Sequence, residues 1–243
     1  MCGPVSICAS TEDTGKNTGR RSSVNDRMGE IMKTACSNYD KMKNAMADSF
    51  LRYDQTEMIR RFSLRSDAQS LYIVFVGRQY RIDRTSGRVQ WQEQDTAVFH
   101  DADYNETMTI YDVLCGGKRD CRAAGTWISI NEISTIKTGN LERNSGFFQQ
   151  TGDFFRGRVP QFCRACEALG GEKQPNGDAA YKLELFPFLP ILLRFWDADE
   201  EFPASLQILV DRNTLDFMHY ETLMFALNHV FRRLKEEIIE EKP

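Results

Sequence analysis

The fold is predicted most clearly by the stretch Tyr181–Asp211, YKLELFPFLPILLRFWDADEEFPASLQILVD. Its first part alternates apolar and charged residues, which is the pattern of a strand with one buried face. A nearly all-apolar strand follows over Phe188–Trp196, and a tight acidic loop, Asp197–Pro203, leads to a third, alternating strand over Ala204–Val210. Connections this short join antiparallel neighbours, so the stretch predicts three antiparallel strands that form a sheet or part of one.

The final element of the chain is predicted to be a long amphipathic helix. Its apolar residues recur at steps of three and four, which places them on one stripe. They are Tyr220, Leu223, Met224, Leu227, Phe231, Leu234 and Ile238. We expect this stripe to cover one face of the sheet, and we expect His229, which lies off the stripe, to be a surface residue.

A second group of strands is predicted nearer the N-terminus. The continuous apolar run Leu71–Val76 is typical of a strand covered on both faces, and Gly77 interrupts it. Arg78–Asp83 and Arg88–Trp91 follow as shorter strands with a Ser-Gly turn between them. Such tight connections allow only antiparallel neighbours, so we expect a meander.

Helical patterns surround these strands. The predicted helices are Met28–Leu51, Gln55–Phe62 with Asp54 as its cap, Thr107–Leu114, and Phe147–Leu169 with an interruption at Pro160. The segment Gly125–Ile130 is predicted to be a short edge strand or an extended connector. Because strands are grouped with strands, the expected fold class is α+β: an antiparallel or mixed sheet flanked by helices in a single domain.

Composition limits the organisation and the partners of the chain. Residues 1–27 are polar and show no apolar period, so we expect a disordered tail, followed by a single domain over residues 28–243. The net charge of −4 argues against non-specific nucleic-acid binding, which needs a basic surface. No apolar run approaches the roughly 18 residues of a membrane helix. The start of the chain lacks an export signal, so we expect a cytoplasmic protein.

Short motifs carry a resemblance to a known family. They are Leu185–Pro190, Phe195–Ala204, Asp211–Asn213, His219–Glu221, Gly77–Tyr80 and Gly125–Ser129. With these motifs the chain resembles the bacterial and archaeal family catalogued as domain of unknown function 3786, over roughly Asn38–Leu234. Some members of that family are fused to a small four-cysteine iron–sulfur domain of the kind found in corrinoid proteins. The resemblance therefore implies cofactor or electron-transfer work in anaerobes, although the tail here has only Cys2 and Cys8.

The acidic loop is the first candidate site. Carboxylate oxygens are the ligands that hard cations prefer, so Asp197, Asp199 and Glu201 are candidate ligands of a divalent metal. The alternative is a solvated hairpin turn whose charges discourage edge-to-edge aggregation. The flanking aromatic residues Trp196 and Phe202 favour a ligand site, because a merely solvated turn does not need them.

Further candidate residues lie outside this loop. We expect Trp127 and His219, together with Trp196 and Phe202, to be cofactor-binding residues. Asp211, Asn213, His219 and Glu221 form a separate cluster near the start of the last helix, with turn formation and helix capping as the alternative roles.

The pair Cys163 and Cys166, among the seven cysteines of the chain, has three alternative roles. Cys163 and Cys166 share a face of a predicted helix and, with Cys115 and Cys121, are candidate ligands of Zn²⁺ or of an iron–sulfur cluster. They are also a candidate redox pair. The third alternative is ordinary packing among apolar neighbours.

Three functions remain open from the sequence. The first is a binding or accessory protein that handles a corrinoid, tetrapyrrole or metal cofactor in anaerobic metabolism, with a protein partner in a cofactor or redox system. The second is a metal-dependent enzyme that uses a carboxylate cluster. The third is a structural subunit of a larger complex. The candidate cofactors are a corrinoid, an iron–sulfur cluster and a divalent metal.

Overall fold

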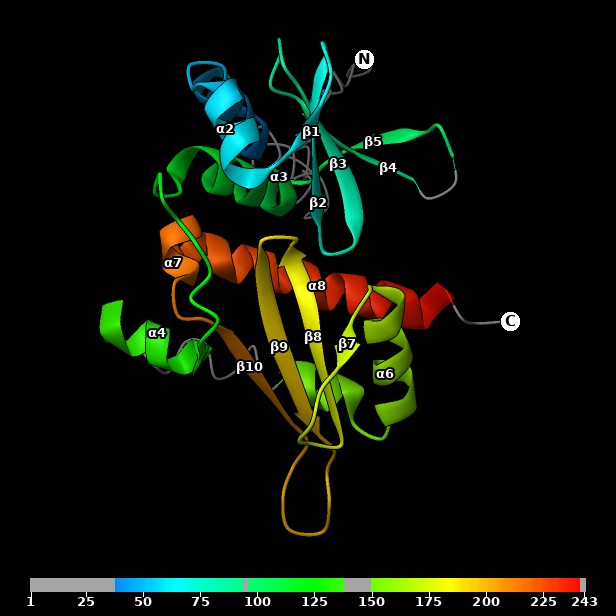
Figure 1. The fold of residues 1–243 in the computed structure, drawn as a ribbon. Helices are drawn as coiled ribbons and strands as arrows, with labels where there is room; N and C mark the ends of the chain where they lie inside the picture. The colour runs from blue at the N-terminus through cyan, green and yellow to red at the C-terminus, as the bar shows by residue number, and fades with distance from the viewer. Residues whose placement is uncertain (1–37, 94–95, 138–149, 241–243) are drawn as a thin grey trace, which may run out of the picture. The chain divides into compact units, whose positions relative to one another are not determined.

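The structure is a computed structural model that describes residues 38–93, 96–137 and 150–240 (Figure 1). The predicted tail, residues 1–27, and its boundary with the domain lie outside these ranges. The described residues from Tyr39 onward belong to one compact unit. This unit is an α+β domain with two antiparallel sheets and flanking helices, which confirms the predicted fold class.

The first sheet is an antiparallel meander whose strands are adjacent in the order of the chain. They are β1 (Arg65–Ser66), β2 (Ser70–Phe75), β3 (Arg78–Asp83), β4 (Val89–Gln92) and β5 (Phe99–Asp101). The predicted meander is confirmed, but the prediction that its apolar strand is covered on both faces is wrong. Successive residues of a strand alternate between its faces, and only the face with Leu71, Ile73 and Phe75 is buried, whereas Val74 is 37% exposed.

Helices accompany the first sheet. They are residues 38–50, α2 (Gln55–Phe62), α3 (Tyr104–Tyr111) and the π-helical turn η1 (Asp112–Gly116). The Asp54 carboxylate accepts hydrogen bonds from the N–H groups of Thr56 and Glu57, which confirms the predicted cap of α2. The predicted start of the next helix at Thr107 is wrong. Asp103 and Glu106 form a reciprocal capping box, so α3 begins at Tyr104.

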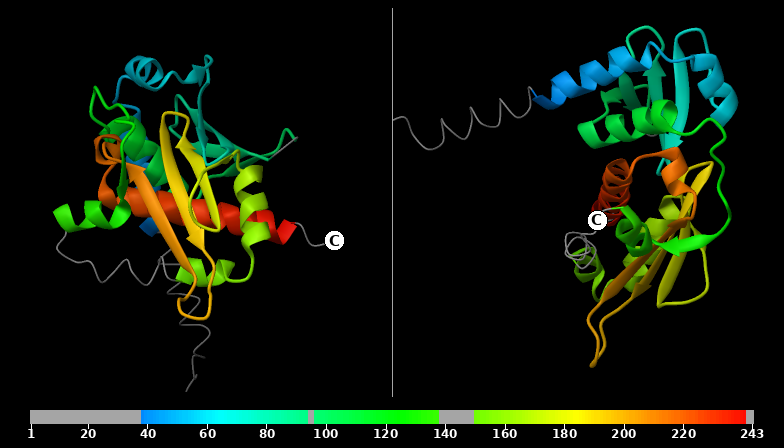
Figure 2. Two further views of the ribbon diagram at one scale, coloured as in Figure 1. Left: turned by 60° about the horizontal axis from the view of Figure 1, so that its bottom comes forward. Right: turned by 90° about the vertical axis from the view of Figure 1, so that its left-hand side faces the viewer.

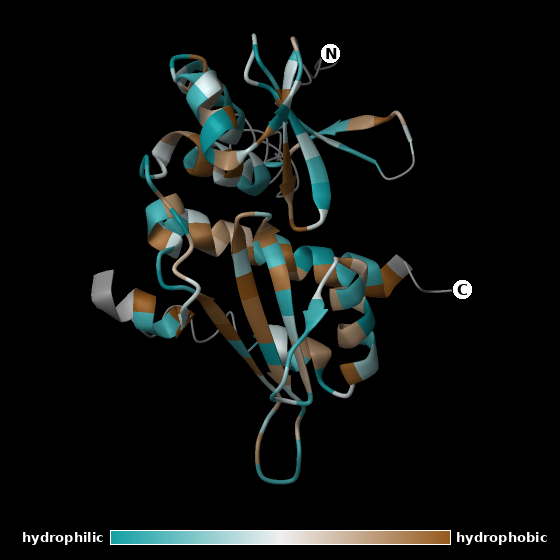
Figure 3. Cartoon of the chain, in the orientation of Figure 1, coloured by the Kyte–Doolittle hydropathy of each residue, from teal (hydrophilic) through white to brown (hydrophobic). Residues whose placement is uncertain are grey.

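The second sheet contains the three strands predicted from Tyr181–Asp211. In spatial order it comprises β6 (Trp127–Ser129), β10 (Ser205–Asp211), β9 (Leu189–Trp196), β8 (Ala179–Phe186) and β7 (Glu172–Lys173). All neighbouring pairs are antiparallel, and β9 and β10 are apolar along most of their length (Figure 3). Of the two alternatives predicted for the segment near Gly125, the edge strand is confirmed, because within the described ranges β6 pairs with β10 alone.

Helices cover one face of the second sheet. The elements are α4 (Ile130–Lys137), α6 (Val159–Ala168), α7 (Thr214–Phe217) and the long α8 (Tyr220–Glu240), and α6 and α8 lie on the same side (Figure 2). Residues 150–155 are helical, and the chain turns over residues 156–158. Pro160 lies in the first turn of α6, so the predicted interruption of the helix near this proline is confirmed. None of the helices in the described ranges is both long and apolar enough to cross a membrane.

The two sheets are joined at one point. Val76 and Gly77, the turn between β2 and β3, both have positive φ (48° and 69°), which is the conformation of a type I′ hairpin turn. The Val76 N–H, beyond the end of β2, donates to the carbonyl of Leu185 in β8 at 3.0 Å. Beside this hydrogen bond the rings of Phe75 and Phe186 stack with centroids 4.8 Å apart, so both sheets contribute to one core.

Removal of the Phe186 ring should destabilise both sheets. Phe186 is fully buried and stacks on both Phe75 and Phe188, so Phe186→Ala is expected to lower the free energy of unfolding by about 3–5 kcal/mol. Urea unfolding followed by circular dichroism measures the loss. Phe202→Ala is the matched control, because Phe202 is 66% exposed. Equal unfolding free energies for the two variants would contradict the shared core.

Candidate functional site

An open pocket of about 440 Å³ lies beside the edge of β2. Its walls come from α2, β1, β2, β3 and the turn between β8 and β9. The apolar lining residues are Phe62, Leu64, Ile73, Val74, Pro187 and Phe188. The polar lining residues are Arg61, Ser63, Arg65, Tyr72 and Gln79. A pocket of this size, mostly apolar with a few polar groups at its margin, is the common form of a ligand site.

The pocket exists because β1 does not extend back from Arg65 along the edge of β2. The chain before Arg65 is instead the C-terminal end of α2. Ser63 is the C-cap of α2 with φ 52°, and its N–H donates to the carbonyl of Ile59. The chain therefore joins the sheet only at Arg65, which pairs with Tyr72. Among the described residues, the edge of β2 is uncovered between Tyr72, which pairs with Arg65, and Val76, which bonds to Leu185. The pocket includes Tyr72 and Val74 from the outer face and Ile73 from the core face, so it wraps around this edge.

Aromatic stacking holds the walls of the pocket in place. The rings of Phe62 and Phe188 stack with centroids 4.5 Å apart. Phe188 continues in near-parallel contact with Phe186 and with Phe217. The pocket wall is therefore an extension of the aromatic core, and we expect it to be rigid before any ligand binds.

Two arginines lie at the margin of the pocket and differ in the contacts that their guanidinium groups make. The Arg61 guanidinium lies over the Phe62 ring and donates to the carbonyls of Leu114 and Gly117, so its position is fixed. Arg65 lies over the Tyr72 ring, 4.1 Å from its centroid. Among the described residues Arg65 has no carboxylate within ion-pair distance, although its charge contributes, after the hydrogen bond from the Tyr72 hydroxyl, to the lowered pKa of the Asp67 carboxyl. Its guanidinium therefore stands at the pocket margin, where it can meet an anionic group.

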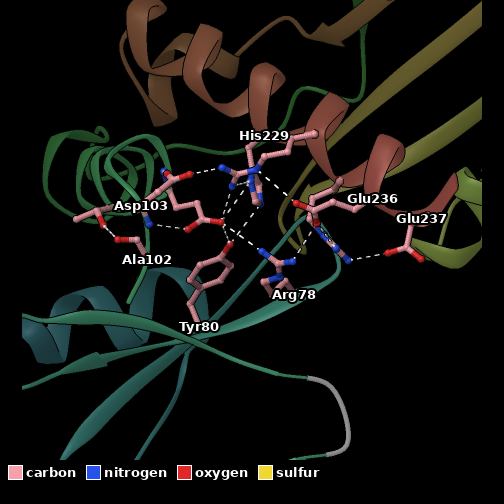
Figure 4. A network of polar contacts seen from close by, with 11 residues as sticks. Arg78, Tyr80, Ala102, Asp103, His229, Glu236 and Glu237 are labelled. Carbon is pink, nitrogen blue, oxygen red and sulfur yellow. Dashed lines mark hydrogen bonds and ion pairs between the residues drawn. The ribbon is translucent and has the colours of Figure 1, made fainter. Parts of the chain in front are cut away.

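A second feature is a buried polar network between α3, β3 and α8 (Figure 4). At its centre the Glu106 carboxylate, 2% exposed, accepts from the Tyr80 hydroxyl at 2.9 Å and from Arg232 Nη2 at 2.7 Å. Arg78 Nη1 lies 3.4 Å from the same oxygen and Arg78 Nη2 lies 3.1 Å from Glu236. The network therefore ties the meander to the long C-terminal helix.

His229 belongs to this network, so its prediction as a surface residue is wrong. Its side chain is 1% exposed and stacks on Phe75, because α3 and β3 cover the face of α8 that carries it. Arg232 Nη2 lies 2.8 Å from His229 Nδ1, so Nδ1 accepts and the proton lies on Nε2, 3.3 Å from the Tyr80 oxygen. The assigned chain of donors therefore runs from His229 through Tyr80 to Glu106.

Burial shifts the protonation of these groups. Burial lowers the pKa of His229 well below its ordinary value, and the nearby arginines add to that shift. Burial raises the pKa of Glu106 and that of Tyr80. Groups with shifted pKa values often mark catalytic sites. The side chains of Glu106 and His229, however, are almost inaccessible to solvent, and both already have polar partners within the network. We interpret this network as a clamp between elements.

A polar cavity of about 1100 Å³ adjoins the outer side of this clamp. Its lining includes Arg78, Trp91 and Arg233. Both arginines are already paired with glutamates of α8, and Trp91 is covered by Arg78 on one side and stacked with His100. A ligand there would have to displace existing contacts, so the apolar pocket is the better candidate.

The predicted carboxylate ligands lie in the loop between β9 and β10, where backbone N–H groups bind two of the three, Asp197 and Asp199. Asp197 accepts from the Gly157 N–H at 2.9 Å. Asp199 Oδ1 accepts from the N–H groups of Glu201 and Phe202, and these bonds lower its pKa. In the described ranges no three His, Cys, Asp or Glu side chains are close enough to hold a metal ion. The metal assignment to Asp197, Asp199 and Glu201 stays a prediction.

The predicted cofactor-binding residues lie in three places. Trp196 and Phe202 are at the β9–β10 loop, with Trp196 opposite Ser205. Trp127 pairs with Asp211 at the other end of β10, about 20 Å away at 3.3 Å per residue. The backbone N–H of His219 donates to the Asp112 carboxylate, and the ring Nδ1 of His219 is hydrogen-bonded to the same carboxylate. None of these residues lines the pocket beside β2.

The other predicted clusters have structural contacts. Asp211 is buried and accepts from the N–H groups of Ala124, Gly125 and Asn213, which fits the turn-forming alternative. Cys163 and Cys166 lie on α6 as predicted, and burial raises the pKa of the Cys166 thiol. These observations favour packing for Cys166.

The pocket residues were not among the predicted site residues. The sequence carried two usable signals: the short gap between the end of α2 and the apolar strand, and the paired aromatic residues around Pro187. Neither signal shows that these segments meet, because they lie more than 100 residues apart in the chain.

Replacement of His229 should change how stability depends on pH. The unfolded state takes up a proton as the pH falls below the ordinary histidine value, about 6.5, whereas folded His229 stays neutral, so stability is present above that pH and lost below it. The His229→Gln variant lacks this term. Between about pH 7.5 and 5.5 the wild type should lose about 1.4 kcal/mol relative to the variant, measured by urea unfolding. Parallel curves for the two proteins would refute the buried neutral state of His229.

Comparison with known proteins gives one match. A family model, domain of unknown function (DUF3786), matches residues 54–233, about three quarters of the chain. No match was found among curated proteins or among solved structures. The matched range lies within the part of the chain that the motifs indicated, and it includes both sheets, the pocket and the buried network apart from Glu236. The chain belongs to the DUF3786 family.

Proposed function

We propose that this protein acts by binding, as an accessory protein, and that its partner occupies the pocket beside the edge of β2. The observation that carries the proposal is the convergence of Phe62, Leu64, Ile73 and Phe188 on one open pocket next to the unpaired cation of Arg65. An apolar group that enters this pocket is removed from water on several sides, which supplies the binding energy.

The lining of the pocket favours binding over catalysis. Its described lining residues include no carboxylate, histidine, cysteine or lysine. The hydroxyl groups in the lining are those of Ser63 and Tyr72; no general base is among the described lining residues to activate Ser63, and the Tyr72 hydroxyl already donates to Asp67. Glu106 and His229, whose pKa values are shifted by burial, are enclosed in the clamp and do not line the pocket. The proposal of an accessory protein therefore rests on the chemistry of the lining.

The expected role in cofactor metabolism forms part of this proposal. In it, the protein serves a partner in a cofactor or redox system of an anaerobe, and the cofactor is a corrinoid, a tetrapyrrole, an iron–sulfur cluster or a divalent metal. This role and the cytoplasmic location derive from the sequence and stay predictions. Anaerobic purification followed by an absorption spectrum and metal analysis tests whether the chain itself carries the cofactor.

A fluorescent probe tests the pocket. Anilinonaphthalene sulfonate combines apolar rings with an anionic group, as the pocket and Arg65 require. We expect the wild type to bind it and Val74→Trp, which fills the pocket from its outer face, to bind it about tenfold more weakly in a fluorescence titration. Val98→Trp is the matched control, because Val98 is 48% exposed and lies outside the pocket.

The controls decide between the two candidate regions. Equal probe affinity for Val74→Trp and the wild type would overturn the proposed pocket. A loss of affinity in Phe202→Ala, with none in Val74→Trp, would instead assign binding to the loop that carries the predicted site residues.

A further inference from the structure

The edge of β2 has one hydrogen-bonding position open in the pocket. In a two-residue hairpin the residues that flank the turn, here Phe75 and Arg78, bond to each other, and alternate residues point their backbone groups the other way. The N–H and C=O of Val74 therefore point away from β3. Two neighbours confirm this alternation: Tyr72 pairs outward with Arg65, and the Val76 N–H bonds outward to Leu185.

Val74 itself has no partner on that side in the described part of the chain. The position opposite it would belong to Ser63, but the Ser63 N–H is bonded to Ile59 within α2. A donor and an acceptor of the main chain thus face the pocket between two occupied positions. Unpaired strand edges of this kind bind extended peptide segments.

We infer that the partner inserts a short extended peptide segment that pairs with the backbone of Val74, places an apolar side chain against Phe62 and Phe188, and directs a carboxylate to Arg65. This inference rests on the proposed function and names the chemistry of the partner at the same pocket. The peptide N–H donates to the Val74 carbonyl and the peptide carbonyl accepts from the Val74 N–H.

The dimensions of the gap set the length of the segment. Val76 lies four positions after Tyr72, which corresponds to about 13 Å of strand edge at 3.3 Å per residue. This length accommodates about three extended residues. Because β1 and Leu185 occupy the two flanks, the segment is a chain end or a sharply bent loop.

Fluorescence anisotropy with labelled peptides tests the inference. The reference probe is fluorescein-labelled Glu-Ile-Leu-Ile with an amidated C-terminus. A second probe replaces Glu by Gln and keeps a free C-terminal carboxylate, and a third has Gln and an amide, so that its peptide part carries no carboxylate. The fluorescein group, which has a carboxylate of its own, is the same in all three probes, so only the difference between probes is interpreted. The tighter of the first two identifies the source of the peptide carboxylate, and both should bind more tightly than the third probe to the wild type but not to Arg65→Gln.

Two changes remove the backbone pairing itself. Val74→Pro deletes the free N–H at an edge position where proline is tolerated, and Val74→Ala is its matched control with the N–H retained. On the peptide side, N-methylation of the central leucine deletes the complementary donor. Each deletion should weaken binding about tenfold, whereas Val74→Ala should change it less than about threefold.

The outcomes separate this inference from the proposed function. If the N-methylated peptide binds the wild type as tightly as the reference peptide, backbone pairing is overturned, even where Val74→Pro fails to fold. If anilinonaphthalene sulfonate binds in the pocket and no peptide does, the peptide is wrong and the pocket stands. If neither probe binds, both proposals fall. Equal binding of the charged and neutral peptides overturns the role of Arg65.

Discussion

The junction between β2 and β8 is the contact on which the rest of the domain depends. One backbone hydrogen bond, from Val76 to Leu185, and one stacked ring pair, Phe75 on Phe186, join two sheets that are otherwise separate ladders. The junction brings the β8–β9 turn, with Pro187 and Phe188, beside the end of α2. Without it the walls of the pocket, which come from distant parts of the sequence, would not meet.

The buried clamp secures the same arrangement from the other side of the turn. It contains three buried side chains: Glu106 on α3, Tyr80 on β3 and His229 on α8. The Tyr80 hydroxyl is hydrogen-bonded to both of the others. A buried charge without a partner is costly, so such a network tolerates only one relative position of its elements. The clamp and the aromatic junction therefore fix the first sheet on α8 and β8, and the pocket forms at the margin of that interface.

The sequence was informative wherever local pattern determined local structure. The alternation through Tyr181–Asp211 predicted β8, β9 and β10 and their pairing, and Asp54 predicted the start of α2. The family resemblance was likewise confirmed over residues 54–233. Long-range contacts were not accessible in this way. His229 lies off the apolar stripe of its helix, and only the position of α3 and β3 explains why it is buried.

The candidate site shows the same limit. The sequence predicts a metal site in the acidic loop because its carboxylates are close together in the chain. In the structure, backbone N–H groups bind Asp197 and Asp199. The pocket depends on a conformational detail, the left-handed Ser63 that ends α2, and on the missing partner of Val74. Neither detail has a distinctive residue pattern, because serine and valine occur at many positions of ordinary strands and caps.

Amide hydrogen exchange of the free protein, followed by NMR, tests the open edge of β2 most directly. The Val76 N–H is bonded across the sheet junction and should exchange only on global unfolding. The Val74 N–H, two residues earlier and within β2, should exchange faster by several orders of magnitude because it faces the pocket without a partner in the described part of the chain. Equal protection of the two amides would show that the edge is closed, and would contradict both the pocket and the pairing inferred there.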